Sequence, residues 1–283
     1  MSRPGRVFRI FLAVLLAGIF IELLSIISIL TGGPSERGDV AVVELSGPID
    51  ESRPTVEALK KYVDQDDVKA IVLRVDSPGG AIGSSQEIHD AVEQANRKKS
   101  VVVSMGNVAA SGGYYVSAPA AKILADPGTI TGSIGVISQF FVVEDLLKKA
   151  HLRWEVIKAG DVKDIGSPLK MMTEKERKLL QGLTDDMHEQ FIEAVAKGRR
   201  LSIEKVRKLA DGSIYSGRKA KELGLVDALG GLEAAVKLAG ELGKVKGEPK
   251  VILPERERFR WFKRLADGKF EAPSLRIEYR FLP

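Results

Sequence analysis

Two apolar runs, each followed by a glycine-rich turn, decide the fold of this chain. The first is AIVLRV at residues 70–75, which is followed by DSPGG at 76–80. The second is SVVVSM at 100–105, and it leads into an SGG turn at 111–113. Short apolar runs bounded by glycine are typical of buried strands, and helical spacing between them, at 84–96, predicts a parallel pair joined by a helix. Both turns are then expected at the carboxyl ends of strands, where open α/β sheets place their ligands.

The same alternation continues outward along the chain. VAVVEL at 40–45 predicts another strand, and helical spacing follows at 55–63. Further on, Thr173 and Glu176 have the T-x-x-E spacing of a capping box, which predicts a long helix that ends near residue 199. The fold class expected from these residues is therefore layered α/β with much parallel pairing.

Composition excludes several classes of protein. The chain has 283 residues, of which 44% are apolar and 29% charged, a balance that argues against global disorder. It has no cysteine, which excludes disulfides, a thiol nucleophile and iron–sulfur ligation. The three histidines have no paired spacing, and no nucleotide-binding glycine motif is present. We therefore expect neither a metal nor a cofactor.

Residues 10–30 form an apolar run of 21 residues with one charge, Glu22. As a helix this run would be about 31 Å long, which matches the core of a bilayer. It is longer than the apolar region of a cleaved signal peptide, so we expect a retained anchor, with a cleaved signal as the alternative. Three arginines precede it, which places the N-terminus in the cytoplasm and the chain from about residue 34 outside the cell membrane.

The net charge of +5 is confined to the two ends of the chain. Residues 1–9 carry +3 and residues 255–283 carry another +3, so the remainder is close to neutral. A nucleic-acid-binding protein more often carries its charge along a folded face, so we expect no nucleic-acid partner. A basic end beside an apolar run indicates membrane topology instead.

Ser111 is the candidate nucleophile because it lies between Ala110 and Gly112, where a substrate has room to approach. If Ser111 opens a helix, the N–H of Gly112 is free to donate to the carbonyl oxygen of a bound substrate. The N–H of Gly79 or Gly80, which no Cβ shields, could donate to the same oxygen. Two such donors would form an oxyanion hole. The alternative is structural: glycine turns often only join strand to helix, and serine is a common helix cap.

Five longer motifs make the chain resemble the signal peptide peptidase A family in its half-length form. They span about residues 38–240 in order, and read VDSPGG (75–80), SMGNVAASGGYYVS (104–117), GTITGSIGVI (128–137), GDVKDIGSPLKMMTEKE (160–176) and SGRKAKELGLVDALGG (216–231). The resemblance implies a Clp/crotonase-like fold of repeated ββα units behind one N-terminal transmembrane helix. Together with the apolar N-terminal run and the basic C-terminal composition, it leads us to expect three regions: a cytoplasmic stub and anchor at 1–33, a protease domain at 34–245 and a basic, aromatic extension at 246–283.

The resemblance also implies a Ser-Lys catalytic dyad. The family's nucleophile falls on Ser111 and its general base on Lys163. The serine that orients the lysine falls on Ser133, and the oxyanion donors fall on the N–H groups of Gly80 and Gly112. For the first glycine the choice between Gly79 and Gly80 stays open.

A lysine base must be neutral, and burial is the main means of making it so. Val162 and Ile165 flank Lys163 and are expected to help bury it. A carboxylate beside the amine would favour the charged form, so Asp161 and Asp164 are expected to point away.

By resemblance the protein is a membrane-bound serine endopeptidase that degrades remnant signal peptides and other hydrophobic peptides. Family members form ring-shaped homo-oligomers whose serine and lysine come from neighbouring protomers, so the two residues are expected to lie apart in one chain. Three alternatives stay open: a protease for one specific membrane protein, a catalytically silent scaffold, and a crotonase-type acyl-CoA enzyme. The last is disfavoured by the apolar N-terminal run and by the serine in the turn.

Overall fold

The computed structural model describes residues 37–254 and 277–280, together with Leu16 and Gly18, both of which are helical. The apolar run at 10–30 that predicts a membrane anchor lies outside the described residues apart from those two positions. In the described part of the chain, no helix combines the length and the apolar character needed to cross a bilayer. Contacts divide the chain into two units, Met1–Arg37 and Gly38–Pro283, and the second contains the sheets.

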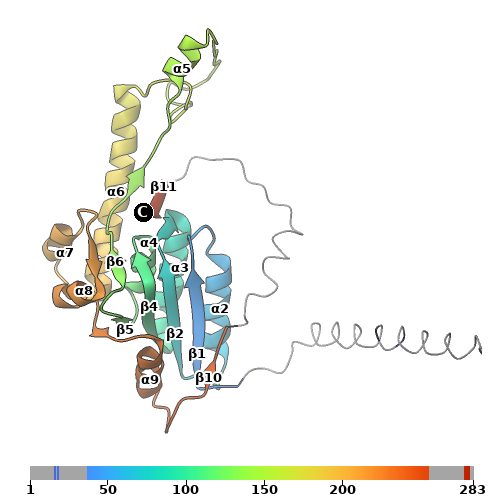
Figure 1. Ribbon diagram of the computed structural model, residues 1–283, viewed down its shortest axis with the longest axis vertical. Helices are drawn as coiled ribbons and strands as arrows, with labels where there is room; N and C mark the ends of the chain where they lie inside the picture. The colour runs from blue at the N-terminus through green and yellow to red at the C-terminus, as the bar shows by residue number, and fades with distance from the viewer. Residues whose placement is uncertain (1–15, 17, 19–36, 255–276, 281–283) are drawn as a thin grey trace, which may run out of the picture. The chain divides into compact units, whose positions relative to one another are not determined.

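Strands and helices alternate along this second unit (Figure 1). In order they are β1 (Val40–Ser46), α2 (Arg53–Asp64), β2 (Ala70–Ser77), β3 (Gly79–Ala81), α3 (Ile82–Lys98), β4 (Ser100–Ala110), α4 (Gly112–Ser117), β5 (Lys122–Ala125), β6 (Ile130–Gly132), β7 (Ile137–Ser138), α5 (Glu144–Lys149), α6 (Glu174–Arg199), α7 (Ile203–Leu209), β8 (Ile214–Ser216), α8 (Gly217–Leu223), β9 (Ala228–Leu229), α9 (Leu232–Leu242), β10 (Val251–Ile252) and β11 (Ile277–Arg280).

A mostly parallel sheet forms the centre, in the order β10-β1-β2-β4-β5-β9. The three strands and two helices expected between residues 40 and 105 are confirmed as β1, α2, β2, α3 and β4. β4 is longer than expected, because it continues through residues 106–110 and changes partner on the way. Its first half pairs with β5, and its last three residues pair with β6.

Alternate residues of the central strands face two separate apolar layers. On β1, Ala41 and Val43 belong to the larger layer, which also includes side chains of α2, α3, α4 and α6. Val40 and Val42 face the smaller layer, which is covered by Ala235 and other residues of α9. Burial on both faces explains why these strands are continuous apolar runs instead of alternating ones.

Asp76 fixes the irregular end of the β2–β4 pairing. The register shifts after Val75, so that β4 carries two more residues than β2 before pairing resumes. The Asp76 carboxylate accepts hydrogen bonds from the Val108 N–H at 3.1 Å and from the Asn107 amide at 3.0 Å. Gly106 makes room for it, since a Cβ there would lie 2.7 Å from the Asp76 carboxyl carbon. Asp76 thus holds the backbone of the neighbouring strand.

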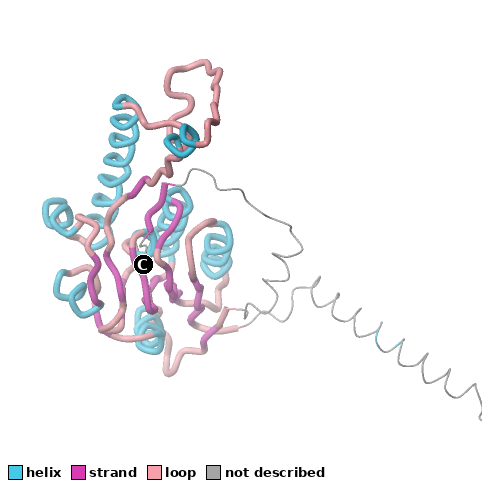
Figure 2. Tube along the Cα trace, turned by 45° about the horizontal axis from the view of Figure 1, so that its top comes forward, coloured by secondary structure: helices cyan, strands magenta, loops and turns pink. Residues whose placement is uncertain are grey.

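The long helix α6 begins as expected from the sequence. Thr173 Oγ1 accepts a hydrogen bond from the Glu176 N–H at 3.2 Å, and Glu176 Oε2 accepts one from the Thr173 N–H at 2.9 Å. The segment before it, residues 137–172, is here called the arm. Figures 1 and 2 show that the arm lies beyond the edge of the central sheet, beside the N-terminal end of α6.

Gly198 allows the C-terminal end of α6 to pack directly on backbone. A Cβ at this position would lie 2.3 Å from the carbonyl oxygen of Ala118, just after α4. We expect Gly198→Ala to force the two segments apart and to lower the free energy of unfolding by about 1–3 kcal/mol, measured by denaturant titration.

Gly182, on an exposed part of the same helix, is the matched control. A Cβ there would meet nothing within 4 Å. Gly182→Ala should therefore raise stability by up to about 1 kcal/mol, as alanine does in a helix. Equal effects at the two positions would show that the close contact at Gly198 does not limit the packing.

Candidate active site

Ser111 lies at the junction of β4 and α4 in a conformation that is rare for a residue with a side chain. Its φ is +55° and its ψ is −119°. Two backbone hydrogen bonds hold it: its N–H donates to the Gly132 carbonyl, and the Tyr115 N–H donates to its carbonyl, each at 2.8 Å. The residue is only 1% exposed. Such strained positions cost about 1–3 kcal/mol and are concentrated at functional sites.

The two glycine turns meet beside Ser111. A Cβ on Gly112 would lie 3.2 Å from the backbone nitrogen of Gly80 and 2.7 Å from Ser85 Oγ. Gly80 itself runs so close to Ile49 that a Cβ would come within 2.4 Å of the Ile49 carbonyl oxygen. The fold therefore brings Gly80, Gly112 and Ser111 into one small region, and only glycine fits at the two contact points.

Ser133 is placed next to the same region by the pairing of β4 with β6. Ala110 and Gly132 are partners in this pairing, so Ser133 follows the residue that bonds to Ser111. Ser133 also has a positive φ, +51°, and its N–H donates to the Ser213 carbonyl at 2.8 Å. Of the five residues proposed for the site from the sequence, four thus lie together.

Lys163, the fifth, lies in the arm and is exposed. No hydrogen bond or ion pair of its amine is found among the described residues, and none joins it to Ser111. Val162 and Ile165 are each half-buried but do not bury the lysine, so that expectation is wrong for a single chain. That the serine and the lysine of a working site come from neighbouring protomers stays a prediction.

The two acids beside Lys163 bind other lysines. Asp161 Oδ2 lies 3.3 Å from the amine of Lys175. Asp164 Oδ1 lies 2.5 Å from the amine of Lys158. Both carboxylates are thus turned toward other partners, as expected.

A short C-terminal strand, which sequence reasoning missed, also reaches the site. β11 pairs antiparallel with β3, placing residue 279 opposite Gly80, and antiparallel with β7 on its other side. β11 also contacts α4. The alternating sequence IEYR at 277–280 was the available signal, but four residues are too few to predict a strand with no partner known. The gap between β3 and β7 is thus a place where an extended backbone can bind.

The aromatic residues after Ser111 belong to the core. The Tyr114 hydroxyl donates to the Leu225 carbonyl at 2.9 Å, and burial raises the pKa of this phenol. The Tyr115 ring lies between Phe191 and His89, with centroids 5.0 and 4.8 Å away. Burial lowers the pKa of His89, whose ring packs on Tyr115 and whose Nδ1 lies 3.2 Å from Asp90 Oδ1.

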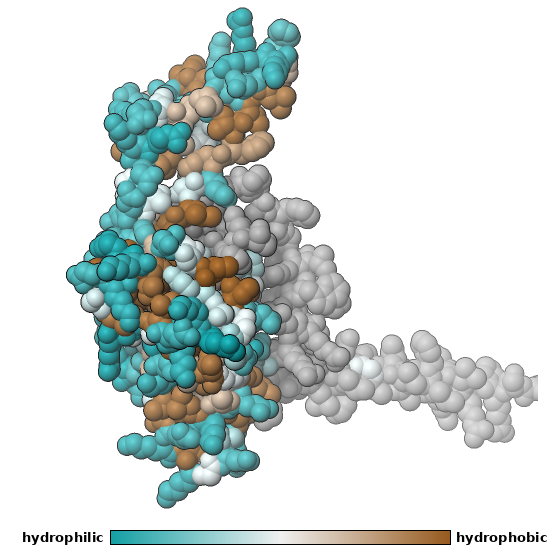
Figure 3. Space-filling model, turned by 60° about the vertical axis from the view of Figure 1, so that its left-hand side comes forward, coloured by the Kyte–Doolittle hydropathy of each residue, from teal (hydrophilic) through white to brown (hydrophobic). Residues whose placement is uncertain are grey.

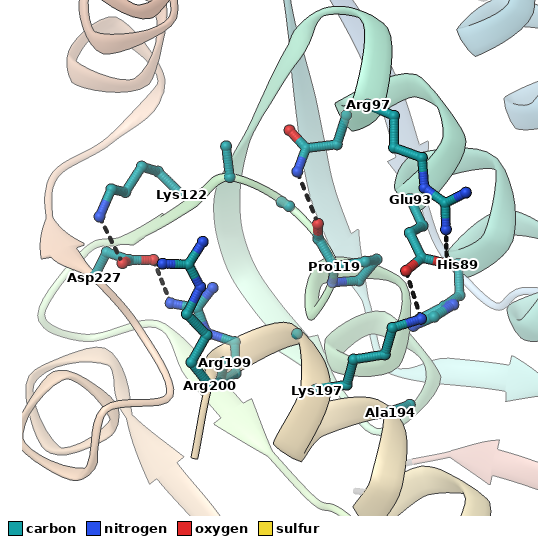
Figure 4. Close-up of a pocket in the computed structure, with 14 residues that line it drawn as sticks. His89, Glu93, Arg97, Pro119, Lys122, Ala194, Lys197, Arg199, Arg200 and Asp227 are labelled. Atoms are coloured by element: carbon teal, nitrogen blue, oxygen red, sulfur yellow. Dashed lines mark hydrogen bonds and ion pairs between the residues drawn. The ribbon is translucent and has the colours of Figure 1, made fainter.

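A cavity of about 450 Å³ lies near the C-terminal end of α6 but contains none of the five candidate residues. Charged side chains that line it form ion pairs: Glu93 with Arg97 and Lys197, and Asp227 with Lys122 and Arg199 (Figure 4). In the described part of the chain, no three acidic or histidine side chains group as metal ligands would. The candidate active site is therefore the region around Ser111.

Two family models match this chain. The model of peptidase family S49 matches residues 93–246, and the model of the Clp protease matches residues 40–125. Both ranges include Ser111 and Gly112, and the first also includes Ser133 and Lys163.

Curated relatives agree with these matches. A Synechocystis sp. protein named provisionally as a protease, slr0021, is 44% identical over 209 residues, covering 74% of this chain and 76% of the relative. "Protease 4" of Salmonella typhi is 41% identical over 180 residues, which is 63% of this chain but 29% of that protein. "Serine protease SPPA, chloroplastic" of Arabidopsis thaliana is 29% identical over 243 residues, which is 81% of this chain and 36% of the relative.

The chain thus spans about a third of the two longer proteases. It has a mixed α/β, Clp-protease-like domain around a central sheet, and the residues of the Ser111 region lie inside the matched segments. The chain belongs to peptidase family S49, the SppA family of serine proteases.

Proposed function

We propose that this serine peptidase is a membrane-anchored endopeptidase in which Ser111 is the nucleophile and Lys163 the general base. Its substrates are remnant signal peptides and other hydrophobic peptides. The observation that carries the proposal is the strained Ser111 beside the two glycine turns. A strained serine at the turn from a strand into a helix is typical of serine nucleophiles.

The oxyanion of the tetrahedral intermediate would lie between the N–H groups of Gly80 and Gly112. The two turns are in contact at these residues, since the missing Cβ of Gly112 would lie 3.2 Å from the Gly80 nitrogen. The Gly79 N–H already donates to Ser77 Oγ at 3.1 Å. That bond favours Gly80 over Gly79 as the second donor. Two preorganised backbone donors are worth several kcal/mol in such a transition state.

The peptide substrate would bind as an added strand between β3 and β7. The protein's own β11 pairs with both, and it runs past Gly80. Strand addition suits an endopeptidase because backbone hydrogen bonds bind any extended chain, while side-chain preferences come from the surrounding walls.

We propose that Lys163 acts on Ser111 of a neighbouring protomer in a ring-shaped homo-oligomer. In one chain its amine is exposed, and an ammonium in water cannot accept a proton. The arm that carries it also exposes large apolar side chains, among them Phe141 (80% exposed) and Trp154 (64% exposed). Figure 3 shows hydrophobic side chains gathered on this arm. Docking the arm on a second copy would cover these side chains and bury the lysine at the same time.

In the proposed reaction, Ser111 Oγ attacks the scissile carbonyl while neutral Lys163 takes its proton. Ser133 would orient the amine. The C–N bond then breaks, and Lys163 returns the proton to the leaving amine. Water attacks the acyl enzyme in the same way and releases Ser111. The proposed anchor at residues 1–33 would hold the protease domain, residues 34–245, near peptides that leave the bilayer, with the N-terminus cytoplasmic and the domain outside.

We expect Ser111→Ala and Lys163→Ala each to lower kcat/KM on a fluorogenic hydrophobic peptide by about 10³-fold or more. Co-expression of the two variants should recover about a quarter of wild-type activity, because a random ring pairs an intact serine with a neighbour's intact lysine at about one site in four. Lys178→Ala, which removes another exposed lysine, is the control and should keep full activity. No recovery in the mixture would place both residues of the dyad in one chain.

We expect truncation after residue 276 to lower KM for the same peptide by at least about 3-fold, with kcat unchanged. The reason is that removal of β11 frees the gap between β3 and β7, so that the substrate no longer competes with the chain's own strand. A chain that lacks only residues 281–283 keeps β11 and serves as the control. An unchanged KM in the longer truncation would mean that substrate does not use this gap.

A further inference from the structure

Four charged side chains form a chain of contacts across the loop that carries Lys163. They are Lys158, Asp164, Lys170 and Glu176. In the sequence Lys163 lies between Lys158 and Asp164, directly before Asp164. The contacts therefore span the loop from its beginning to the first turn of α6.

Distances show which pairs are direct. The Lys158 amine donates to Asp164 Oδ1 at 2.5 Å and to the Asp161 carbonyl at 2.6 Å. The Lys170 amine lies 3.6 Å from the same Asp164 oxygen and 2.5 Å from Glu176 Oε1. Asp164 is thus shared by two lysines and is itself only 15% exposed.

Glu176 fixes one end of this chain of contacts. Its side chain is 2% exposed, and its other oxygen accepts the Thr173 N–H in the capping box of α6. The contact with Lys170 lowers the pKa of Glu176, so it stays ionised at neutral pH. The hydrogen bond from Lys158 likewise lowers the pKa of Asp164. Both carboxylates therefore stay ionised at neutral pH.

For Lys163 to act as a base, no unpaired carboxylate can lie beside its amine. Asp164 is its immediate neighbour, and a free carboxylate within about 4–6 Å of an amine favours the protonated form. Among the described residues, Lys158 and Lys170 are the charged groups in contact with the Asp164 carboxylate, and Lys175 is the one in contact with the Asp161 carboxylate. Both neighbouring carboxylates are thus neutralised by lysines other than Lys163.

We propose that Asp164 is a positioning residue: held by Lys158 and Lys170, it fixes the shape of the Lys163 loop and keeps its own carboxylate away from the Lys163 amine. This inference rests on the proposed role of Lys163 as the base. Asp164 touches neither substrate nor reacting atoms, and acts through the loop and through its charge. Loss of Lys158 frees the carboxylate to pair with Lys163, which then holds its proton more tightly.

The test is a double-mutant cycle of Lys158→Met and Asp164→Asn in the full-length chain, read from the dependence of kcat/KM on pH. The acid limb of this profile reports the ionisation of the essential base in the free enzyme. Lys158→Met should move the acid limb to higher pH by about one unit, since a freed carboxylate stabilises the ammonium. In the Asp164→Asn background the same substitution should move it much less, because no carboxylate is left to be freed. Lys158→Arg keeps the charge and should restore the wild-type profile.

The cycle also removes the direct effect of losing a positive charge. That effect is present in both backgrounds, so equal shifts with and without Asp164 would overturn the inference. Lys178→Met removes the same charge from a lysine paired with Glu174 and should leave the profile unchanged. Full activity in Lys163→Ala would overturn both the proposed function and this inference, whereas equal shifts together with an inactive Lys163→Ala would overturn the inference alone. Size-exclusion elution and circular dichroism of each variant separate these outcomes from misfolding.

Discussion

The geometry of the site depends on the parallel pairing of β2 with β4. From Ala70 opposite Ser100 to Val75 opposite Met105 the two strands run in register, and pairing resumes at Ser77 and Ala109 after the bulge. Parallel strands end at the same edge of a sheet, so the two glycine turns that follow them must meet. The bulge then sets how far β4 extends before Ser111. The close approach of Gly112 to Gly80 and the pairing of β4 with β6 both follow from this register.

The central strands could be predicted because their signal is local and strong. Continuous apolar runs of β-branched residues have few alternatives in a chain of this size. The second half of β4 could not be predicted, since Gly106 and Asn107 have the composition of a turn. The structure uses them differently: Gly106 leaves space for the Asp76 carboxylate, and Asn107 binds it. A tertiary contact between strands here overrides the local preference.

The environment of Lys163 could not be read from its neighbours in sequence. Val162 and Ile165 are apolar and suggest burial, yet burial depends on what covers the arm, and no residue in the described part of the chain buries this lysine. The partners of Asp161 and Asp164 likewise come from positions up to fourteen residues away, on a loop whose shape the sequence does not specify. Motif resemblance could point to Lys163 as the candidate base, but it could not supply the surrounding charges.

The strain at Ser111 and the exposure of Lys163 have different physical consequences. The serine is held in its conformation by β4, β6 and the start of α4, so its geometry exists in every folded protomer. A solvated lysine is an ammonium and no base, so on the proposed mechanism a single protomer has a formed oxyanion site but no means of activating the nucleophile. Association of the arms would then remove water from the Lys163 amine. The neighbouring carboxylates, Asp161 and Asp164, are already paired with other lysines. Peptide hydrolysis would thereby be confined to the assembled enzyme, without any rearrangement of the strands that hold Ser111.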